Sequence, residues 1–357
     1  VNMPSELTCY THVVMDEVHE RTAEIDMLCF IVRLLASHGV DGSDRSRTAQ
    51  HGRGAGLRVV VMSATLQAEL FSAYFSKAVA ALGGVPPTLQ VGARCFPVEV
   101  HFLEDLPRAF NLRRSSFEIQ RRVAEGCPEK GKEKKVDQRH VEKLHTLIVE
   151  LLSQLAVGGC TVLVFLPGIA EISALWEEAR DLEKKGTCKV MPLHSMIPRE
   201  EQEAVFEEPG PDVAHVILAT DIAESSLTLP HVAAVIDTGL HRRIDYDDSR
   251  GMAALATKWI SRAAAKQRSG RAGRTQPGVC VRLYTREFHE KCMEEHQPPE
   301  SSSMPLDRLY LQGKRLVENL LRNLGSFAPK TATEALLELI QPPSLVSLNA
   351  ARNSLAE

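Results

Sequence analysis

The sequence lacks the patterns that mark several classes of protein. Its eight cysteines include no C-x-x-C pair, which argues against a zinc module or a disulfide scaffold and for a reducing compartment. No uninterrupted apolar run is long enough to span a bilayer, and no signal peptide is visible at the start. We therefore expect an intracellular protein, in the nucleus or the cytoplasm, that does not enter a membrane.

The composition is that of a globular protein with one basic region. Hydrophobic residues make up 44% and charged residues 25% of the 357 residues, and the net charge is −4. From Arg250 to Arg286, however, the chain has nine Lys or Arg residues and no acidic residue. A basic region in a mildly acidic protein indicates one anion-binding groove rather than general attraction to polyanions.

Short apolar, β-branched runs alternate with amphipathic stretches, which predicts an α/β fold with parallel strands buried on both faces. The predicted strands are Thr11–Met15, Leu57–Met62, Thr161–Leu166, Cys188–Met191, His215–Ala219, Val232–Ile236 and Val279–Leu283. The predicted helices are Ile25–Ala36, Val141–Leu155, Ile169–Glu183, Arg199–Phe206, Leu306–Leu324 and Thr331–Leu339. Ligands of such sheets bind beyond the carboxyl ends of the strands.

Two polar segments suggest how the chain is divided. Ser37–Gly56 is typical of a loop insertion, and Pro107–Arg139 is charge-dense, with Glu129–Lys135 expected to be mobile. We therefore predict an incomplete first α/β domain over 1–105, a charged linker or insertion over 106–140, a second α/β domain over 141–290, and the start of a helical domain over 291–357.

The octet Gln267–Arg274, QRSGRAGR, is the most informative segment. If it is helical, Arg271 and Arg274 share one face and can converge on one anion, and guanidinium groups match phosphate oxygens. A solvated basic surface helix is the alternative.

Two further motifs follow predicted strands. Asp16 and Glu17 suit a metal–phosphate site, in which Asp16 would hold Mg²⁺ and Glu17 would polarise a water; an acidic helix cap is the alternative. Ser63 and Thr65 of Ser63-Ala64-Thr65 either relay hydrogen bonds between a nucleotide site and a groove or cap the following helix.

The segment Ala219–Thr228, ATDIAESSLT, contains four hydroxyl side chains and two carboxylates. Hydroxyl and backbone N–H groups are the usual contacts to phosphate and ribose that do not depend on base sequence. A turn rich in serine and threonine is the alternative.

Taken together, these motifs resemble the DEAH/RHA branch of superfamily 2 RNA helicases over roughly residues 8–285, and the tail resembles the start of the winged-helix domain of that family. The resemblance rests on Asp16–His19, Ser63–Thr65, Phe165–Gly168, Leu193–Ser195, Ala219–Thr228 and Gln267–Arg274, which occur in family order.

The resemblance implies two RecA-like parallel-sheet domains that bind ATP and Mg²⁺ between them and single-stranded RNA with little sequence preference. It implies catalysis by Asp16, Glu17, His19, Gln267, Arg271 and Arg274, and Mg²⁺ binding by Asp16 and Glu17. It implies that ATP is contacted by Asp16, Glu17, Gln267, Arg271 and Arg274, and by Phe206, which would stack on adenine. Ser63 and Thr65 would couple the nucleotide state to domain movement, and RNA would be bound by Gly168, Thr220, Ser226 and Thr228. For Phe206, a place in the core is the alternative. Arg243–Leu255 matches the position of the strand-separating hairpin of the family.

Three features depart from the family pattern. No phosphate loop, G-x-x-x-x-G-K-[ST], occurs; Gly126–Lys132 imitates one, but Glu133 stands where the Mg²⁺-binding hydroxyl should be. Only fifteen residues precede Asp16, so we expect that the unit with the phosphate loop is missing and that the chain as given does not turn over ATP. Asp221 and Pro230 replace residues that contact RNA in relatives, and Asp221 can only accept hydrogen bonds.

The sequence therefore predicts part of an ATP-dependent RNA helicase. It predicts a monomer that can be stimulated by a protein activator. A catalytically dead scaffold that binds RNA or protein is the rival hypothesis, because the phosphate loop is absent. A DNA helicase also stays open, since only contacts to the 2′-hydroxyl distinguish ribose from deoxyribose.

Overall fold

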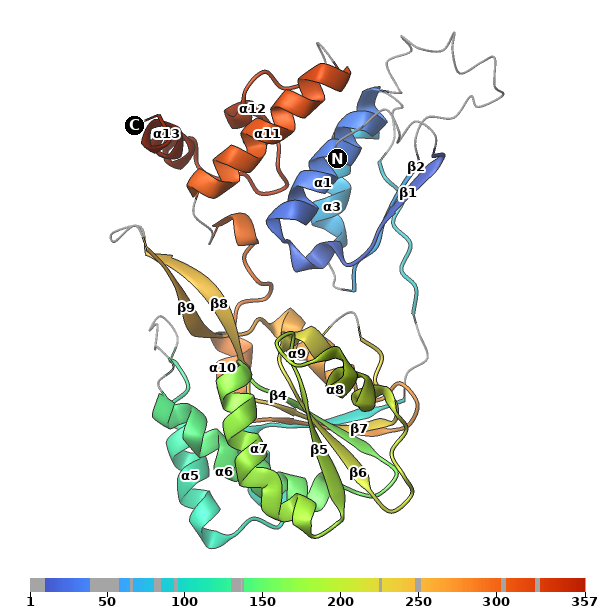
Figure 1. The fold of residues 1–357 in the computed structure, drawn as a ribbon, viewed down its shortest axis with the longest axis vertical. Coiled ribbons are helices and arrows are strands. Elements are labelled where there is room, and N and C mark those ends of the chain that lie inside the picture. Colours follow the sequence, from blue (N-terminus) through green and yellow to red (C-terminus); the bar gives the residue numbers. More distant parts are fainter. Residues whose placement is uncertain are drawn as a thin grey trace. The chain divides into compact units, whose positions relative to one another are not determined.

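The computed structural model describes residues 10–38, 58–64, 67–79, 85–92, 96–129, 136, 138–224, 227–247, 252–302, 306–324 and 328–356. The chain divides into two compact units. Unit 1 combines Val1–Val91, Ile244–Ala254 and Pro298–Glu357, whereas unit 2 combines Gly92–Arg243 and Leu255–Gln297. This division differs from the four predicted segments, because each unit gathers pieces that are far apart in the sequence (Figure 1).

Unit 2 is built on a six-stranded sheet in which all strands are parallel. Its order is β3 (Val98–His101), β10 (Gly278–Arg282), β7 (Val232–Asp237), β4 (Thr161–Phe165), β6 (Ala214–Ala219) and β5 (Cys188–Leu193). The parallel α/β fold is confirmed, and five of these strands lie where the apolar runs predict them. The sequence did not reveal β3, a short edge strand in which valine alternates with Glu99 and His101.

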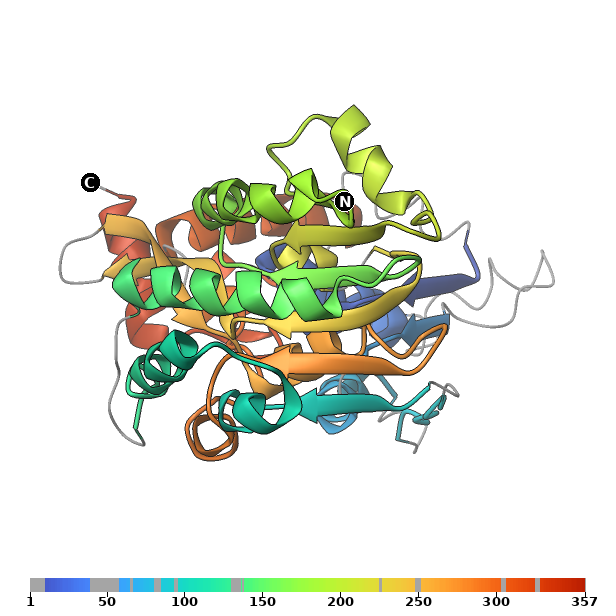
Figure 2. The same ribbon diagram turned by 90° about the horizontal axis from the view of Figure 1, so that it is seen from below.

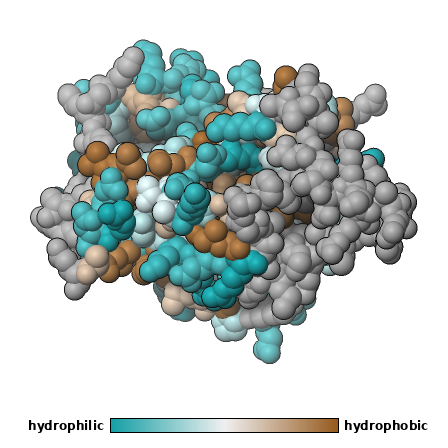
Figure 3. Space-filling model, turned by 90° about the horizontal axis from the view of Figure 1, so that it is seen from above, coloured by the Kyte–Doolittle hydropathy of each residue, from teal (hydrophilic) through white to brown (hydrophobic). Residues whose placement is uncertain are grey.

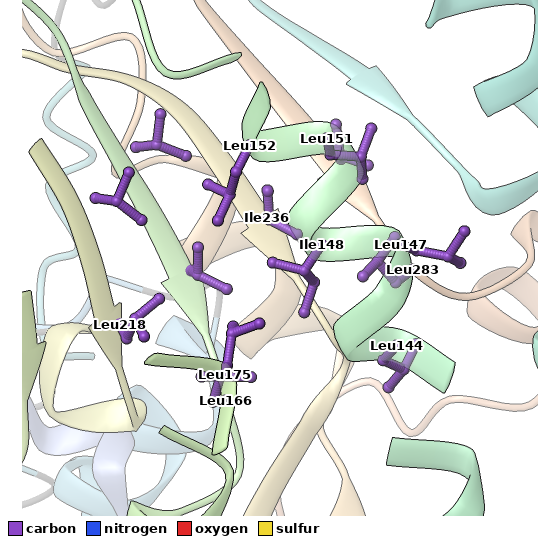
Figure 4. Close-up of a cluster of buried hydrophobic side chains, with 14 of the residues drawn as sticks. Leu144, Leu147, Ile148, Leu151, Leu152, Leu166, Leu175, Leu218, Ile236 and Leu283 are labelled. Carbon is purple, nitrogen blue, oxygen red and sulfur yellow. The ribbon is translucent and has the colours of Figure 1, made fainter. Parts of the chain in front are cut away.

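Alternate residues of each central strand face opposite layers of unit 2. Val162, Val164 and Leu166 pack on one face in a cluster with α6 (Gln138–Leu155) and α7 (Ile169–Lys184) (Figure 4). Leu163 and Phe165 lie in a separate cluster on the opposite face. The strands and helices of these layers run side by side in Figure 2. Both faces are therefore buried, as the continuous apolar runs predict.

The segment predicted as a charged linker is folded into unit 2. It contains α4 (Leu106–Ala109) and α5 (Arg114–Ala124), and its apolar residues Leu106, Leu112 and Val123 are buried in the same cluster as α6. The side chain of Gln154 on α6 accepts a hydrogen bond from the backbone N–H of Asn111 at 3.0 Å. The density of charge concealed these regularly spaced apolar residues, so the linker prediction does not describe this segment.

Unit 1 contains a two-stranded parallel sheet, β1 (His12–Met15) and β2 (Arg58–Val61), with α1 (Ala23–His38) and α3 (Ala68–Val79). Both strands were predicted, but their predicted burial on two faces is wrong. Val14 is 58% and Val60 43% exposed, because no layer of the described residues covers that side of the sheet. Residues on the other side, including Met15, pack with α1 and α3.

The carboxyl-terminal helices of unit 1 pack on α1. They are α11 (Leu306–Leu324), α12 (Ala332–Leu337) and α13 (Leu345–Ser354), and the cluster joins Phe30 and Ile31 to Leu309, Leu320 and other residues. Helices α11 and α12 lie where the sequence predicts helices. The face drawn in Figure 3 shows hydrophobic patches among hydrophilic residues.

The remaining described elements are short helices and one small sheet. They are the short helices η2 (Val18–Glu20), η5 (Leu103–Asp105), α8 (Arg199–Glu203), η6 (Ala204–Phe206), η7 (Asp221–Ala223), α9 (Arg262–Ser269), α10 (Arg286–Lys291) and η8 (Glu300–Ser302), and the two-stranded sheet of β8 (Leu240–Asp247) and β9 (Met252–Trp259). Within the described residues, every helix is too short or too polar to cross a membrane. Most of the predicted loops Ser37–Gly56 and Glu129–Lys135, and the site residues Thr65 and Ser226, lie outside the described residues.

Candidate nucleotide and nucleic-acid site

The carboxyl edge of the unit 2 sheet brings together Gly168 and Thr220, two of the residues predicted to bind nucleic acid backbone. Phe165 at the end of β4 is in register with Ala219 at the end of β6, so Gly168 and Thr220 follow neighbouring strand ends. The hydroxyl of Thr238, which follows β7, donates a hydrogen bond to the carbonyl of Phe165 at 2.8 Å. Gly168 and Thr220 are buried, whereas Thr228 and Asp221 are exposed.

A buried arginine joins this edge to the QRSGRAGR segment. Arg268 is completely buried, and its guanidinium donates to Asp237 Oδ1 at 2.9 Å and to Glu224 Oε2 at 3.0 Å. Its Cζ also lies 4.7 Å from the centroid of the Phe165 ring, and the hydroxyl of Tyr284 donates to Asp237 Oδ2 at 3.1 Å. This network fixes the end of β7, the 220–228 loop and the end of α9 relative to one another.

Burial and ion pairing act in opposite directions on the pKa values of this network. Burial lowers the pKa of Arg268, but Asp237 and Glu224 more than offset it, so the pKa of the guanidinium is raised. Burial raises the pKa of Glu224, and Arg268 only partly offsets this shift. The guanidinium is therefore permanently charged, and both carboxylates stabilise this buried charge.

The prediction that Arg271 and Arg274 share a helix face is wrong. Helix α9 ends at Ser269, and Gly270 is its carboxyl-terminal cap. Arg271 is buried, and its Nε donates to the carbonyl of Glu224 at 3.0 Å while its Nη1 donates to the carbonyl of Leu227. Arg274 is exposed, because the chain turns away through Gly273, whose φ is +76°.

Gly273 also permits the approach of the segment before β3. A Cβ at this position would lie 2.6 Å from Val98 Cγ2 and 2.8 Å from the carbonyl oxygen of Phe96. We expect Gly273→Ala to destabilise unit 2 by about 2–3 kcal/mol, because alanine is strained at positive φ and meets backbone there. Urea unfolding measures this change, with Gly210→Ala as control, since a Cβ at Gly210 meets nothing within 4 Å. Equal stability of the two variants would contradict the prediction.

Another buried group near Arg268 makes stability depend on pH. Burial lowers the pKa of His241 from 6.5 to about 3, with further contributions from Arg268, Arg243 and Lys258. The unfolded chain therefore binds one more proton than the folded chain as the pH falls below 6.5.

We expect the wild type to lose about 1 kcal/mol of unfolding free energy per pH unit, relative to His241→Gln, between about pH 6 and pH 4. Glutamine does not titrate, so unfolding of the His241→Gln variant should not be accompanied by the uptake of this proton. Urea unfolding at several pH values gives the comparison. Parallel pH dependence in both proteins would show that His241 titrates normally in the fold.

The acidic motif occupies the carboxyl end of β1 in unit 1. Glu17 has φ 52°, which is unusual for a residue other than glycine, and its Oε2 lies 3.3 Å from Nδ1 of His19. The backbone N–H of Ala64 donates to the same nitrogen at 3.4 Å, and the N–H of Val18 donates to the carbonyl of Met62 at 3.2 Å. The structure thus brings the Asp16–His19 motif beside Ser63-Ala64.

The alternatives to a functional role are less well supported by this geometry. Glu17 precedes η2 without a side-chain capping bond. Ser63 stands five residues before α3 begins at Ala68. Phe206 is 42% exposed and therefore is not an ordinary core residue.

The acidic pair suits a cation that is also held by phosphate. Among the described residues there is no group of three or more His, Cys, Asp or Glu side chains that could hold a metal by itself. Mg²⁺ usually takes only one or two carboxylates from protein, with water and phosphate completing its shell. Asp16 is exposed and Glu17 half-buried, so their oxygens are accessible to such an ion.

Sequence reasoning missed the buried members of the site. Arg268, Glu224 and Asp237 all stand within or beside recognised motifs, but the sequence assigned them no role. An acidic residue that ends an otherwise apolar strand, as Asp237 does, is the signal that could have suggested a buried partner.

Comparison with known proteins agrees with the resemblance that the sequence motifs indicate. The model of the helicase conserved C-terminal domain matches residues 142–276. The chain is 32% identical to the ATP-dependent RNA helicase DExH1 of Arabidopsis thaliana, across 96% of this chain and 34% of that protein. It is 31% identical to the ATP-dependent RNA helicase DHX29 of Homo sapiens, across 98% of this chain and 26% of that protein. A crystal structure of the Escherichia coli DEAH/RHA helicase HrpB aligns with a TM-score of 0.69 and 25% identity, over 99% of this chain and 36% of that one.

The chain belongs to the DEAH/RHA helicase family. It spans about a quarter to a third of the length of these curated relatives. The parallel sheet of unit 2 corresponds to the RecA-like fold of the family. Residues 142–276 of this family member include the 220–228 loop and the QRSGRAGR segment.

Proposed function

We propose that the natural-length protein is an ATP-dependent RNA helicase that couples ATP hydrolysis to movement on single-stranded RNA and to unwinding or remodelling of RNA–protein complexes. The observation that carries this proposal is the convergence of the family motifs on strand ends. Glu17, His19 and Ala64 meet at the end of β1, while Gly168 and Thr220 follow paired strands of unit 2. The names of the similar proteins DExH1 and DHX29 support RNA as the substrate.

In this mechanism Asp16 and Glu17 would hold Mg²⁺, which would neutralise phosphate charge, and Glu17 would also orient the attacking water. His19 Nδ1 lies 3.3 Å from Glu17 Oε2 and 3.4 Å from the backbone nitrogen of Ala64, so this nitrogen donates to the carboxylate in one tautomer and accepts from the Ala64 N–H in the other. A change around the nucleotide is thereby transmitted to the second strand end of unit 1.

Gln267, Arg271 and Arg274 contact the γ-phosphate in this proposal. Arg271 already donates to two carbonyls of the 220–228 loop. Contact with an anionic phosphate would compete with these neutral acceptors, because charge-assisted hydrogen bonds are stronger. The state of the nucleotide would in this way alter the loop that contains Thr220 and Thr228.

Gly168, Thr220, Ser226 and Thr228 contact the RNA backbone rather than its bases. Such contacts predict weak sequence preference and strong dependence on salt. Asp221 is exposed at the start of η7, where its carboxylate would repel a phosphate, so this side chain contributes no direct phosphate contact.

The decisive experiment is ATP hydrolysis by the natural-length protein with and without poly(U). We expect RNA to stimulate phosphate release. RNA binding without any hydrolysis would overturn the enzyme and favour a non-catalytic scaffold. Equal stimulation by poly(dT) would overturn the restriction to RNA.

The exposed ring of Phe206 gives a prediction for the nucleotide. If it stacks on adenine, Phe206→Ala should raise KM for ATP about tenfold and change kcat little, because one stacking contact is worth about 1–3 kcal/mol. Steady-state ATPase kinetics measures both constants. Val157→Ala is the control, since Val157 is also an exposed apolar side chain of unit 2, at 59%. Unchanged KM in the Phe206 variant would exclude the stacking role.

A further inference from the structure

An arginine that the family motifs do not include lies directly over Gly168. Arg242 belongs to β8, and a Cβ placed on Gly168 would meet its Cδ at 3.0 Å, its Nη1 at 3.1 Å and its Nε at 3.2 Å. The absence of a side chain at Gly168 therefore lets the guanidinium rest against the backbone at the end of β4. The Arg242 side chain is 30% exposed, so it also reaches the surface.

A buried carboxylate holds Arg242 in this position. Its Nη2 donates to Oε1 of Glu171 at 2.8 Å, and the Glu171 side chain is only 2% exposed. The other oxygen, Oε2, has no hydrogen-bond partner within the described part of the chain. Because the ion pair with Glu171 already restricts the Arg242 side chain, little further side-chain entropy is lost when the exposed side of the guanidinium binds a ligand.

The electrostatics of this place favour an anion. Gly168 is the amino-terminal cap of α7, a helix of 16 residues, and as a glycine it makes no side-chain capping hydrogen bond. The amino-terminal end of a helix carries partial positive charge, so a cation there is unfavourable unless negative charge accompanies it. Glu171 lies in the first turn of α7 and supplies this negative charge, so the groups that a phosphate can meet are the exposed side of the Arg242 guanidinium and the N–H groups of the helix end.

We propose that Arg242 is a further phosphate-binding residue for the backbone of single-stranded RNA, and that Glu171 is its positioning residue. The inference rests on the proposed function and deepens it, because Gly168 and Thr220 lie at the same sheet edge. The guanidinium supplies the charge that the small and hydroxyl residues of this edge lack. Sequence reading missed it because its partner Glu171 lies 71 positions away in the chain.

The test replaces the pair without changing net charge. The double variant Arg242→Gln with Glu171→Gln leaves no unpaired buried carboxylate. The matched control is Arg180→Gln with Glu177→Gln, which removes another ion pair of α7, at 2.9 Å, whose side chains are more than half exposed. Fluorescence anisotropy with a labelled oligo(U) at several salt concentrations gives the affinity, and thermal unfolding verifies that both variants are folded.

We expect the Arg242/Glu171 variant to bind about fivefold more weakly, with a slope of log K against log salt reduced by about 0.7, as for one lost phosphate contact on a single strand. The control should bind like the wild type. Wild-type affinity and slope in the Arg242/Glu171 variant would overturn this inference alone. Failure of the wild type to bind oligo(U) would overturn the proposed function and the inference with it.

Gly168→Ala provides an independent measurement. The three atoms nearest to the added methyl group belong to the Arg242 side chain and not to backbone, so the fold should tolerate it. We expect Gly168→Ala to weaken oligo(U) binding in the wild type and to have a clearly smaller effect in the Arg242/Glu171 variant. An equal effect in both backgrounds would mean that Arg242 takes no part in the contact.

Discussion

Glu17→Gln should reduce RNA-stimulated ATP turnover by the natural-length protein by about 10²–10⁴-fold, the usual contribution of a positioned general base. The amide has nearly the shape of the carboxylate but cannot accept a proton from water. The side chain is 33% exposed at the end of β1, so the replacement leaves no buried charge unpaired and the fold should persist. KM for ATP should change much less than kcat.

Phosphate release under single-turnover and steady-state conditions measures this loss. Glu24→Gln is the matched control, because Glu24 is an exposed carboxylate in the first turn of α1, on the same unit. It should keep wild-type turnover. Full activity of the Glu17 variant would exclude Glu17 as the residue that activates water, even if RNA-stimulated hydrolysis itself is observed.

Arg268→Met should destabilise unit 2 by about 3–5 kcal/mol, the usual result of removing one partner from a buried ion pair. Arg268 and Asp237 are both completely buried, and methionine leaves Asp237 and Glu224 without their cation. The lost packing on Phe165 is smaller, because methionine can fill much of the same space. The unfolding midpoint in urea should fall accordingly.

A compensating variant separates charge from packing. Adding Asp237→Asn and Glu224→Gln to Arg268→Met removes both unpaired carboxylates and should recover part of the lost stability. Arg180→Met is the control; its ion pair is exposed, so its loss should cost less than about 1 kcal/mol. If Arg268→Met were no less stable than Arg180→Met, the proposed structural role of the network would be wrong.

The strands of unit 2 were predictable because a strand that is buried on both faces is a continuous apolar run in the sequence. The helices were predictable because they are amphipathic. The run TVLVF became β4, with all five residues buried, and helices α6 and α7 lie where their amphipathic patterns predict them. The same rule failed for β1 and β2. Their apolar residues predicted two covered faces, but Val14 and Val60 are exposed among the described residues.

The site was predictable only where its chemistry is local in sequence. Asp16, Glu17, Gly168, Thr220 and Phe206 were identified from short motifs, and their roles stay predictions. The error at Arg271 and Arg274 came from assuming that a spacing of three residues means a helix. Gly270 ends α9 before either arginine, and the two side chains have different environments.

The sequence by itself determined the α/β class, most strands and helices, and the family, because these depend on periodicity and on contiguous motifs. Only the tertiary structure decided which charges meet. Arg268 lies 31 positions from Asp237 and 44 from Glu224, and Arg242 lies 71 from Glu171. Parallel strands bring such distant residues to one edge of a sheet, and burial then makes each charge depend on its partner. No local pattern records that dependence.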